Sequence, residues 1–347
     1  MSALRVVAVD VASSDPAQEA LLRGGVEVHN ASQRERWGDT GRLTSVEHER
    51  SEAADDTSAS SAYVVLDGPG GATDDVVGWA TVDVPLRDNP DLAWLHLVVH
   101  PDHRRRGVAS LLLGAAEDVA RDAGRILVGS SSVPVGQDDP AEPVAARHGY
   151  VVGQEIHRNT MELTHDDAER TRLEGLAAGA DGSPYGLEVA LDSPPEHWWA
   201  GMAEQYRRIS TDAPAGDIPY GEEDWDADRV RAKTARALAA GAHLAWAAAF
   251  APDGSMVALT EIETNPTDLA TAQQDTTLVL REHRGHRLGL RVKAANALQV
   301  LDRLPQVARV TTWNAVDNGP MIATNTALGY RATGRVRQWT KDLRPAR

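Results

Sequence analysis

The twelve residues Val98-Val99-His100-Pro101-Asp102-His103-Arg104-Arg105-Arg106-Gly107-Val108-Ala109 predict a strand that passes into a helix. Apolar residues stop at Val99, and after Gly107 they recur at helical spacing. The first N–H groups of a helix have no partner inside the helix, and with the helix dipole they attract an anion. Gly107 tolerates a left-handed backbone, which lets neighbouring N–H groups converge on a ligand. With the positive charge of Arg104 to Arg106, the segment predicts a pyrophosphate site.

The alternative interpretation is that Gly107 only turns the chain and that the arginines only cover a solvated surface. A second segment of the same kind, Arg284-Gly285-His286-Arg287-Leu288-Gly289, favours the anion site. Neither segment contains GxxxxGK followed by Ser or Thr, so a P-loop is excluded. The GxGxxG pattern of the dinucleotide-binding fold is absent as well.

The two segments belong to a repeat with an offset of 180 residues. With this offset, residues 77–83 align with residues 257–263, and residues 98–104 align with residues 278–284. Because each copy is large enough for its own core, we expect a duplicated domain rather than a short-period solenoid. The sequence divides into predicted domains at 1–164 and 185–347, a linker at 165–184, and a polar stretch, 47–61, interpreted as a mobile loop.

Each copy has the same order of predicted elements. Strands are followed by a long helix after the arginine-glycine segment, then by a further strand, a short helix and a last strand. The predicted strands include 6–9, 62–66, 76–84, 95–99 and 126–128 in the first copy and 187–191, 243–250, 256–264, 277–280 and 307–312 in the second. The fold class is therefore α+β, with a central mixed, mostly antiparallel sheet flanked by helices in each copy.

The composition limits the classes of function. The chain has 347 residues, which corresponds to two domains at ~150 residues per domain. It has no cysteine, which excludes disulfides, thiolate metal sites and cysteine nucleophiles. A net charge of −16 argues against nucleic-acid binding and suits a cationic partner, although acidic charge also keeps proteins soluble. With no apolar run of membrane-spanning length and no secretory signal pattern, we expect a cytoplasmic protein.

The arginine-glycine segment resembles the acetyl-CoA motif of the GNAT (GCN5-related N-acetyltransferase) family, Gln/Arg-x-x-Gly-x-Gly/Ala. Arg104, Gly107 and Ala109 match it in the first copy. In the second copy one arginine and the last glycine match, whereas Arg287 stands where the motif has its first glycine. The resemblance covers nearly the whole chain as two tandem domains. The layout is similar to that of actinobacterial tandem members such as mycothiol synthase.

The resemblance implies acetyl-CoA as co-substrate and no metal. Backbone amides of the strand before each turn would pair with the pantetheine arm, and the turn would hold the pyrophosphate. The acetyl-CoA-binding residues so implied are Val98, Val99, Arg104, Arg105, Arg106, Gly107, Val108, Ala109, Ser110, Leu278, Val279, Arg284, Gly285, His286, Arg287, Leu288, Gly289 and Asn318. His103 and His283 recur at one point of the repeat, and we expect them to brace the turn.

Acyl transfer to an amine needs a base, because an ammonium group has no lone pair, and it needs a proton source for the leaving thiolate. Glu261 and Glu263 point the same way on a predicted strand and are the predicted base, with Asp275 as a further candidate. The alternative is a solvated strand end. The family's frequent tyrosine acid is absent, because its register falls on Ala145 and Asn325. Asn325 is therefore included among the catalytic residues, with water as the alternative proton source.

Acidic residues with interleaved tryptophans follow the first strand of the second copy. Trp199, Asp212 and Trp225 are the predicted acceptor-binding residues, because carboxylates and aromatic faces attract a cationic amine. The alternative is a solvated acidic loop with tryptophan in the core. We place the acceptor chemistry in the second copy and expect acetyl-CoA in either.

These features predict an acyl-CoA-dependent N-acyltransferase that acts directly on a small, cationic amine. One alternative is a CoA-binding sensor without turnover, which the missing tyrosine suggests. Another is a tandem enzyme with one degenerate domain. We expect no nucleic-acid or membrane partner, and either a monomer or a homodimer.

Overall fold

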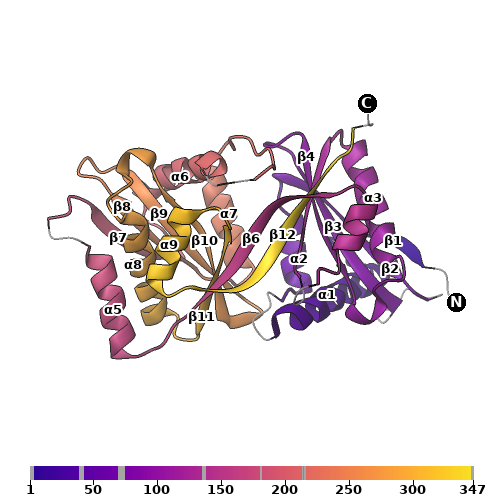
Figure 1. The fold of residues 1–347 in the computed structure, drawn as a ribbon, viewed down its shortest axis with the longest axis horizontal. Helices are drawn as coiled ribbons and strands as arrows, with labels where there is room; N and C mark the ends of the chain where they lie inside the picture. Colours follow the sequence, from indigo (N-terminus) through magenta and orange to yellow (C-terminus); the bar gives the residue numbers. More distant parts are fainter. Residues whose placement is uncertain are drawn as a thin grey trace. The chain divides into compact units, whose positions relative to one another are not determined.

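The computed structural model describes residues 4–38, 43–68, 75–134, 138–179, 182–212, 214 and 216–344. The chain forms two compact units (Figure 1). The N-terminal unit contains residues 1–155, 216–219 and 335–347, and the C-terminal unit contains residues 156–215 and 220–334. Among the described residues, no helix combines the length and the apolar character that a bilayer crossing requires.

The described strands of the N-terminal unit lie in the order β1-β2-β3-β4-β5-β12. Neighbouring strands are antiparallel except β4 and β5, which are parallel. The bounds are β1 Arg5–Val9, β2 Ser58–Leu66, β3 Val76–Pro85, β4 Leu92–Val99, β5 Leu127–Ser132 and β12 Arg331–Asp342, of which residues 335–342 belong to this unit.

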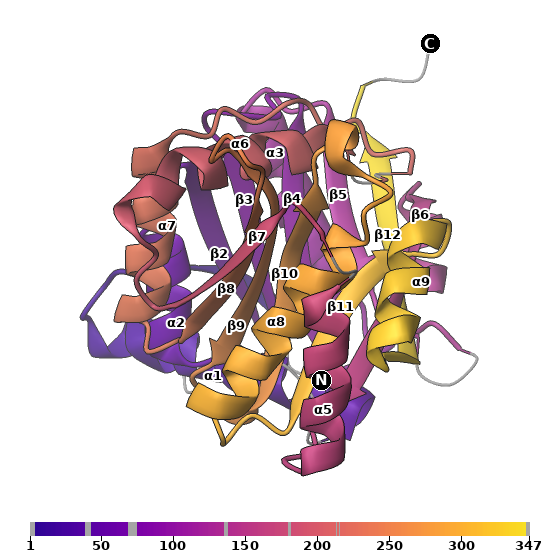
Figure 2. The ribbon, with the colours of Figure 1, turned by 90° about the vertical axis from the view of Figure 1, so that its left-hand side faces the viewer.

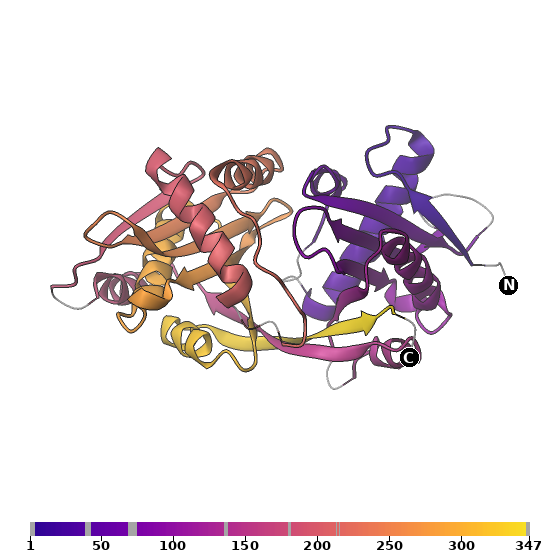
Figure 3. The same cartoon turned by 90° about the horizontal axis from the view of Figure 1, so that it is seen from above.

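Helices cover both faces of this sheet (Figure 3). The helices α1 (Pro16–Trp37) and α2 (Val46–Ala53) pack on one face, α3 (Val108–Asp122) packs on the other, and the short α4 (Glu142–Arg147) follows. The alternation of strand residues directs Trp79 and Val98 towards α1, and Val82 and Leu95 towards α3. Gly25 of α1 makes this packing possible, because a Cβ there would lie 2.2 Å from the ring of Trp79.

The C-terminal unit repeats this arrangement. Its described strands lie in the order β6-β11-β10-β9-β8-β7, and again one internal pair, β10 with β11, is parallel. The bounds are β6 Val151–Glu162, of which residues 156–162 belong to this unit, β7 Gly186–Leu191, β8 Leu244–Phe250, β9 Met256–Asn265, β10 Asp268–Val279 and β11 Arg309–Ala315.

Helices lie on both faces of the C-terminal sheet as well (Figure 2). The helices α6 (Trp199–Asp212) and α7 (Ala227–Ala239) pack on one face against Trp246 and Leu259. The helix α8 (Leu288–Arg303) packs on the other face, with α5 (Asp167–Ala178) and α9 (Gly319–Leu328) beside it. The α+β class with a mixed, mostly antiparallel sheet in each copy is thus confirmed.

The two compact units differ from the two consecutive halves of the sequence. In β12, residues 337–342 pair with β5 of the N-terminal unit, and in β6, residues 156–162 pair with β11 of the C-terminal unit. Each half of the sequence therefore supplies the last strand of the other unit. The predicted division at 1–164 and 185–347 did not include this exchange, because a repeat in sequence does not reveal which copy a strand joins.

Three local expectations need correction. The predicted linker contains α5, whose Leu173 is buried in the core beside α8. The stretch interpreted as a mobile loop contains α2 and the start of β2. The offset of 180 is not constant: Ala62 faces Thr81 and Trp246 faces Glu261, so β2 and β8 are offset by 184.

Candidate functional site

In both units the turn before the long helix contains two left-handed residues separated by one residue. In the N-terminal unit these are Arg105 (φ 61°) and Gly107 (φ 89°), and in the C-terminal unit Gly285 (φ 87°) and Arg287 (φ 56°). In the described part of the chain no side chain caps the start of α3 or α8. The first N–H groups of both helices are therefore available to an anion, which agrees with the sequence prediction.

The departure from the motif at Arg287 leaves the backbone of the second turn unchanged. Arg287 adopts the left-handed conformation that Gly107 adopts in the first turn. A left-handed conformation costs a residue with a Cβ about 1–2 kcal/mol. The structure accepts this strain at Arg105 in one turn and at Arg287 in the other.

Two of the three arginines of the N-terminal turn, Arg104 and Arg106, are bound to carboxylates. Arg104 donates to both carboxylate oxygens of Glu35 at the end of α1, with an Nη1–Oε1 distance of 2.9 Å. Arg106 lies 2.7 Å from Asp67 and donates to the His103 ring at 2.9 Å. His103 thus braces the turn as expected. Although the guanidinium charges of Arg104 and Arg106 are already paired, the backbone N–H groups at the start of α3 remain as donors for an anion.

Asp212 takes the corresponding place in the C-terminal unit. It accepts from Arg281 at 2.9 Å and from Arg284 at 2.7 Å, and its side chain is 7% exposed. The hydrogen bond and charge of Arg281, with a contribution from Arg284, outweigh burial and lower the pKa of Asp212. Asp212 was predicted to bind the acceptor, but the structure places it against the turn. The His283 ring shares a 3.0 Å hydrogen bond with the Tyr185 hydroxyl, which agrees with a bracing role.

The parallel strand pairs end before the residues implied for pantetheine binding. β4 pairs with β5 only from Leu92 to Leu95, and β10 pairs with β11 only from Thr271 to Gln273. Val98 and Val99, and likewise Leu278 and Val279, lie beyond the paired part. The strands therefore part on the side of the turn, as the family resemblance implies.

A bulge marks this point in the C-terminal unit. The pairing of β10 with β9 shifts register between Gln274 and Thr277, so Asp275 and Thr276 form the bulge opposite Glu261. The described pairing of β3 with β4 runs from Gly78 to Asp83 with no such shift. The irregularity at the strand divergence is thus specific to the C-terminal unit within the described pairing.

Glu261 is completely buried and both of its carboxylate oxygens are engaged. Lys233 of α7 donates to Oε1 at 2.6 Å. Trp246 of β8 donates to Oε2 at 3.0 Å, and the Tyr206 hydroxyl of α6 donates to the same oxygen. Gln274 donates to the backbone carbonyl of Glu261 at 2.5 Å. A buried carboxylate is thereby held by an ammonium group and two neutral donors.

These contacts determine the ionisation of the pair. Burial disfavours the charged form of Glu261, but Lys233 and the two neutral donors outweigh it, so the pKa of the carboxyl lies below its ordinary value. Burial likewise opposes the charge of Lys233, but the Glu261 carboxylate outweighs it and raises the pKa of the lysine well above its ordinary value. Both groups are charged at neutral pH.

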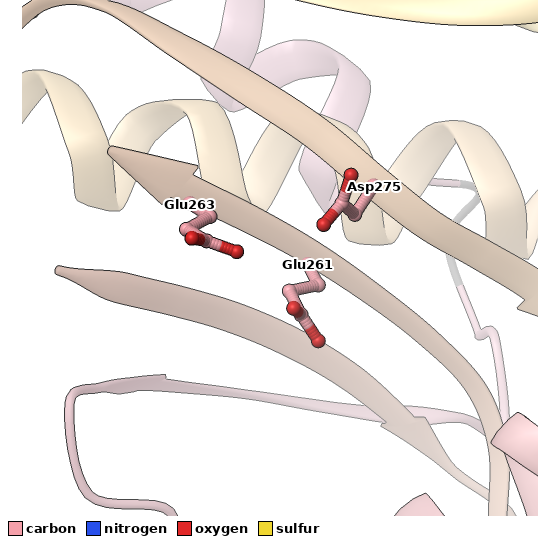
Figure 4. Close-up of side chains that lie close together, drawn as sticks. All are labelled: Glu261, Glu263 and Asp275. Atoms are coloured by element: carbon pink, nitrogen blue, oxygen red, sulfur yellow. The ribbon is translucent and has the colours of Figure 1, made fainter. Parts of the chain in front are cut away.

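Glu263 and Asp275 lie beside this pair (Figure 4). The three carboxylates offer oxygen atoms that all lie within 4.8 Å of one another. Glu263 is partly exposed, and Asp275 accepts from Gln273 at 2.7 Å. The predicted base residues are thus brought together, with Glu261 enclosed and Glu263 more accessible. Oxygen ligands of this kind also suit a hard cation, but the Lys233 ammonium already occupies one of them.

Each of the two predicted acceptor tryptophans has an arginine over its ring. Trp225 stacks on Tyr206 with ring centroids 4.8 Å apart, and the Arg229 guanidinium lies 4.1 Å from its ring centre. Arg231 lies 5.2 Å from the ring centre of Trp199. Trp225 therefore supports the Tyr206 side of the Glu261 group, whereas Trp199 contributes to the core beneath α7.

The predicted asparagines lie on α9. Asn318 caps this helix by accepting from the Met321 N–H at 3.2 Å. Asn325 donates to Asn314 of β11 at 2.6 Å, while its own Oδ1 is buried without a hydrogen bond. The role of Asn318 in acetyl-CoA binding and that of Asn325 in catalysis stay predictions.

Three residues of the buried group were not predicted from the sequence: Tyr206, Lys233 and Trp246. They come from three elements, α6, α7 and β8, so no local spacing connects them. One signal was present, because lysine occurs in the chain only at 233, 293 and 341. A rare ammonium group in an acidic protein was a candidate partner for the predicted carboxylates.

Comparison with known proteins agrees with this geometry. Residues 27–150 match the acetyltransferase (GNAT) family. A tandem GNAT protein from the clavulanic acid biosynthesis pathway is 25% identical, with a TM-score of 0.77 and coverage of 99% of this chain and 100% of that chain. A GCN5-related N-acetyltransferase from Sphaerobacter thermophilus, 14% identical, has the same fold at a TM-score of 0.65, with coverage of 99% of this chain and 97% of that one.

A mycothiol acetyltransferase from Sanguibacter keddieii is 39% identical over 108 residues. The match spans 31% of this chain and 31% of that relative, so the similarity is limited to one region of each protein. The family match, the duplicated turn-and-helix geometry and the full-length similarity to a tandem protein agree with one another. Residues 27–150 thus match the acetyltransferase (GNAT) family, and the whole chain has the fold of a tandem GNAT protein.

Proposed function

We propose that the chain is an acyl-CoA-dependent N-acyltransferase that moves an acyl group from acetyl-CoA to a small cationic amine. The observation that carries the proposal is the buried Glu261 group opposite the β10 bulge. It places ionised side chains where the parallel strands part, beside a helix start that is open to a pyrophosphate. The match of residues 27–150 to the GNAT family supports acetyl-CoA as the donor.

The residues at both turns fit acetyl-CoA. The uncapped first turns of α3 and α8 offer N–H groups to the pyrophosphate. The backbone of Val98 and Val99, and of Leu278 and Val279, lies beyond the paired part of the adjacent strand and can pair with the pantetheine arm. Acetyl-CoA would supply the activated acyl group.

The charges near Glu261 support a cationic acceptor. Glu261, Glu263 and Asp275 bring three carboxylates together, and Lys233 offsets one of them. The remaining negative charge attracts a cationic amine. Because the oxygens of Glu261 are engaged, Glu263 is the proposed base for the acceptor's proton. The amine nitrogen then attacks the thioester carbon and the carbon–sulfur bond breaks. The nitrogen loses its second proton to water as the amide forms, and the thiolate takes a proton from water.

The placement of this chemistry in the C-terminal unit rests on a difference between the copies. At the places of Trp246 and Glu261 the N-terminal unit has Ala62 and Thr81. The register shift opposite Glu261 also has no counterpart in the described pairing of β3 with β4. These differences support the C-terminal unit as the site of the cationic amine.

Two measurements test the proposal. Calorimetry with acetyl-CoA measures donor binding, and thiol release over a panel of polyamines, aminoglycosides, amino acids and peptides measures transfer. Glu263→Gln is expected to lower kcat/KM for the best amine by about 100-fold or more, with unchanged acetyl-CoA affinity. Glu174→Gln, on the exposed surface of α5, is the matched control and should retain full activity.

The outcomes separate the alternative functions. Binding of acetyl-CoA without thiol release for any amine would support the CoA-binding sensor instead. Absence of acetyl-CoA binding would remove both interpretations. Loss of all transfer on Glu263→Gln would support a tandem enzyme with one working domain.

A further inference from the structure

The N-terminal sheet carries a polar group of its own on the face that packs against α1. Ser60 of β2 pairs with Asp83 of β3, Asp83 pairs with Trp94 of β4, and Thr81 pairs with His96. Directly paired residues of neighbouring strands share a face, so these side chains lie together. Trp79 and Val98, on the same face, pack in the core with α1.

Asp83 and His96 lie beside each other within this group. The Ser60 hydroxyl donates to one carboxylate oxygen of Asp83, and the other oxygen lies 4.0 Å from Nε2 of His96. The His96 side chain is 60% exposed and that of Asp83 is 34% exposed. An imidazole beside a fixed carboxylate and open to solvent can accept a proton and release it to water.

The position of this pair matches the reaction region of the other unit. His96 is the first residue of β4 after Leu95, the last residue paired with β5. With the offset of 180 that β3 and β4 share with β9 and β10, His96 corresponds to Thr276 of the bulge and Asp83 corresponds to Glu263. Each unit thus has an acid-base group where its parallel strands part, but the side chains differ.

The donor side of the N-terminal unit is intact. Its turn carries Arg104, Gly107 and Ala109 of the motif, and α3 starts without a side-chain cap. The match to the GNAT family, residues 27–150, lies entirely within this unit. A turn for the donor and the Asp83–His96 pair at the strand divergence therefore occur together in a unit that has Thr81 at the place of Glu261.

We propose that the N-terminal unit is a second acyl-transfer centre, in which His96 is the base and Asp83 is a positioning residue. The proposal rests on the proposed function, since it requires acyl-CoA at the α3 turn. A protonated primary amine gives one proton to His96, its nitrogen attacks the thioester carbon, and the carbon–sulfur bond breaks. The nitrogen loses its second proton as the amide forms, and one of the two released protons goes to the thiolate and the other to water.

The acceptor of this centre differs from that of the C-terminal unit. Glu261 is enclosed by α6 and α7, whereas His96 is largely open. Trp94 lies beside His96, and its ring covers Gly129 of β5, where a Cβ would come within 2.4 Å of the ring. A broad aromatic surface next to the base suits a primary amine with an apolar or aromatic body.

The test uses the full-length chain with Glu263→Gln as background, so that transfer in the C-terminal unit is reduced. Adding His96→Gln should lower the remaining thiol release with phenethylamine or tryptamine by about 100-fold. His197→Gln is the matched control, because His197 is 58% exposed and lies 3.2 Å from Glu188. Asp83→Asn should lower kcat with little change in KM, and Asp83→Glu should restore part of it.

The outcomes are distinct. If acetyl-CoA binds and His96→Gln leaves thiol release unchanged with every amine, the second centre is refuted and the proposed function stands. The same holds if His197→Gln and His96→Gln have equal effects. If calorimetry shows no acetyl-CoA binding to the chain, the proposed function is refuted, and the second centre that rests on it is refuted with it. Two acetyl-CoA molecules bound per chain, with selective loss of aromatic-amine transfer on His96→Gln, would support the proposal.

Discussion

At Glu261 a carboxylate with no exposed surface is kept ionised by a lysine from another element. The Lys233 side chain is 32% exposed, so the pair is enclosed on the carboxylate side only. Because the pKa of Glu261 is lowered in the fold, its contribution to stability is present at neutral pH and is lost as the pH falls through the lowered value. The fold therefore depends on this pair most at neutral pH.

Replacing Lys233 by methionine should destabilise the chain by about 3 kcal/mol, because it leaves a buried carboxylate without its counter-charge. Urea unfolding at neutral pH measures the change. Arg231→Met on the same helix removes surface ion pairs with Glu196 and Asp228 and the contact with the Trp199 ring, and should cost no more than about 1 kcal/mol. Equal losses of unfolding free energy in the two variants would show that the buried Lys233–Glu261 pair contributes no more than a surface ion pair.

Lys293 of α8 is a buried ammonium group of the opposite kind. Burial lowers the pKa of Lys293 to about 7, and the nitrogen lies 5.2 Å from the ring centre of Tyr330. Between pH ~7 and the ordinary lysine pKa of about 10.4, the unfolded chain holds a proton that the folded chain has released. Stability should therefore rise with pH in this window.

Lys293→Met should abolish that rise and should stabilise the protein at pH 7 and below. Melting temperatures of both proteins across the window measure the difference. Parallel pH profiles for the variant and the original chain would contradict the prediction.

At the scale of elements, both units connect the turn to the end of the helix that follows the first strand, α1 after β1 and α6 after β7, by the same kind of ion pair. Arg104 binds Glu35 of α1, and Arg284 binds Asp212 of α6. The two carboxylates differ in residue type, yet the same link is formed in each unit. The pair therefore fixes the end of the helix beside the donor turn in both.

Asp212→Asn should speed amide hydrogen exchange in the last turn of α6 and leave α1 unchanged. Glu35→Gln is the matched variant and should do the reverse. The loss of charge-assisted hydrogen bonds should cost each variant about 1 kcal/mol. Unchanged exchange at both helix ends would show that the pairs do not hold these ends.

The sequence predicted elements where the signal was local. Apolar runs next to turn signals located β3 and β9, and helical spacing located α3 and α8. The short α2 was missed because its polar residues show little periodicity, and the Glu261 group was seen only in part because Tyr206, Lys233 and Trp246 come from separate elements. The burial of a side chain and its pairing with residues far along the chain cannot be predicted from local spacing.

At the scale of the whole molecule, the exchanged last strands make each unit depend on both halves of the sequence. Residues 337–342 pair with β5, and Trp339 is buried in the core of the N-terminal unit, where its ring N–H donates to Ser132 at 2.7 Å. The N-terminal unit is therefore completed by residues that follow the whole of the second copy.

Deleting residues 335–347 should destabilise the N-terminal unit selectively, because it exposes β5 and removes Trp339 from the core. Limited proteolysis should then cleave within residues 1–155 while the described part of residues 220–334 stays protected. Trp339→Ala, which keeps the backbone, should give a weaker form of the same pattern, at about 3–5 kcal/mol. Uniform protection of residues 1–155 in the deletion would contradict the role of β12.

This exchange sets an order of events on the ribosome. Translation proceeds at about 5–20 residues per second, so about 10–40 s separate the synthesis of residue 155 from that of residue 335. Throughout that interval the nascent chain has an unpaired β5 edge, which is a template for association with other chains. Production of this protein should therefore be sensitive to translation speed and to chaperones that shield nascent strands.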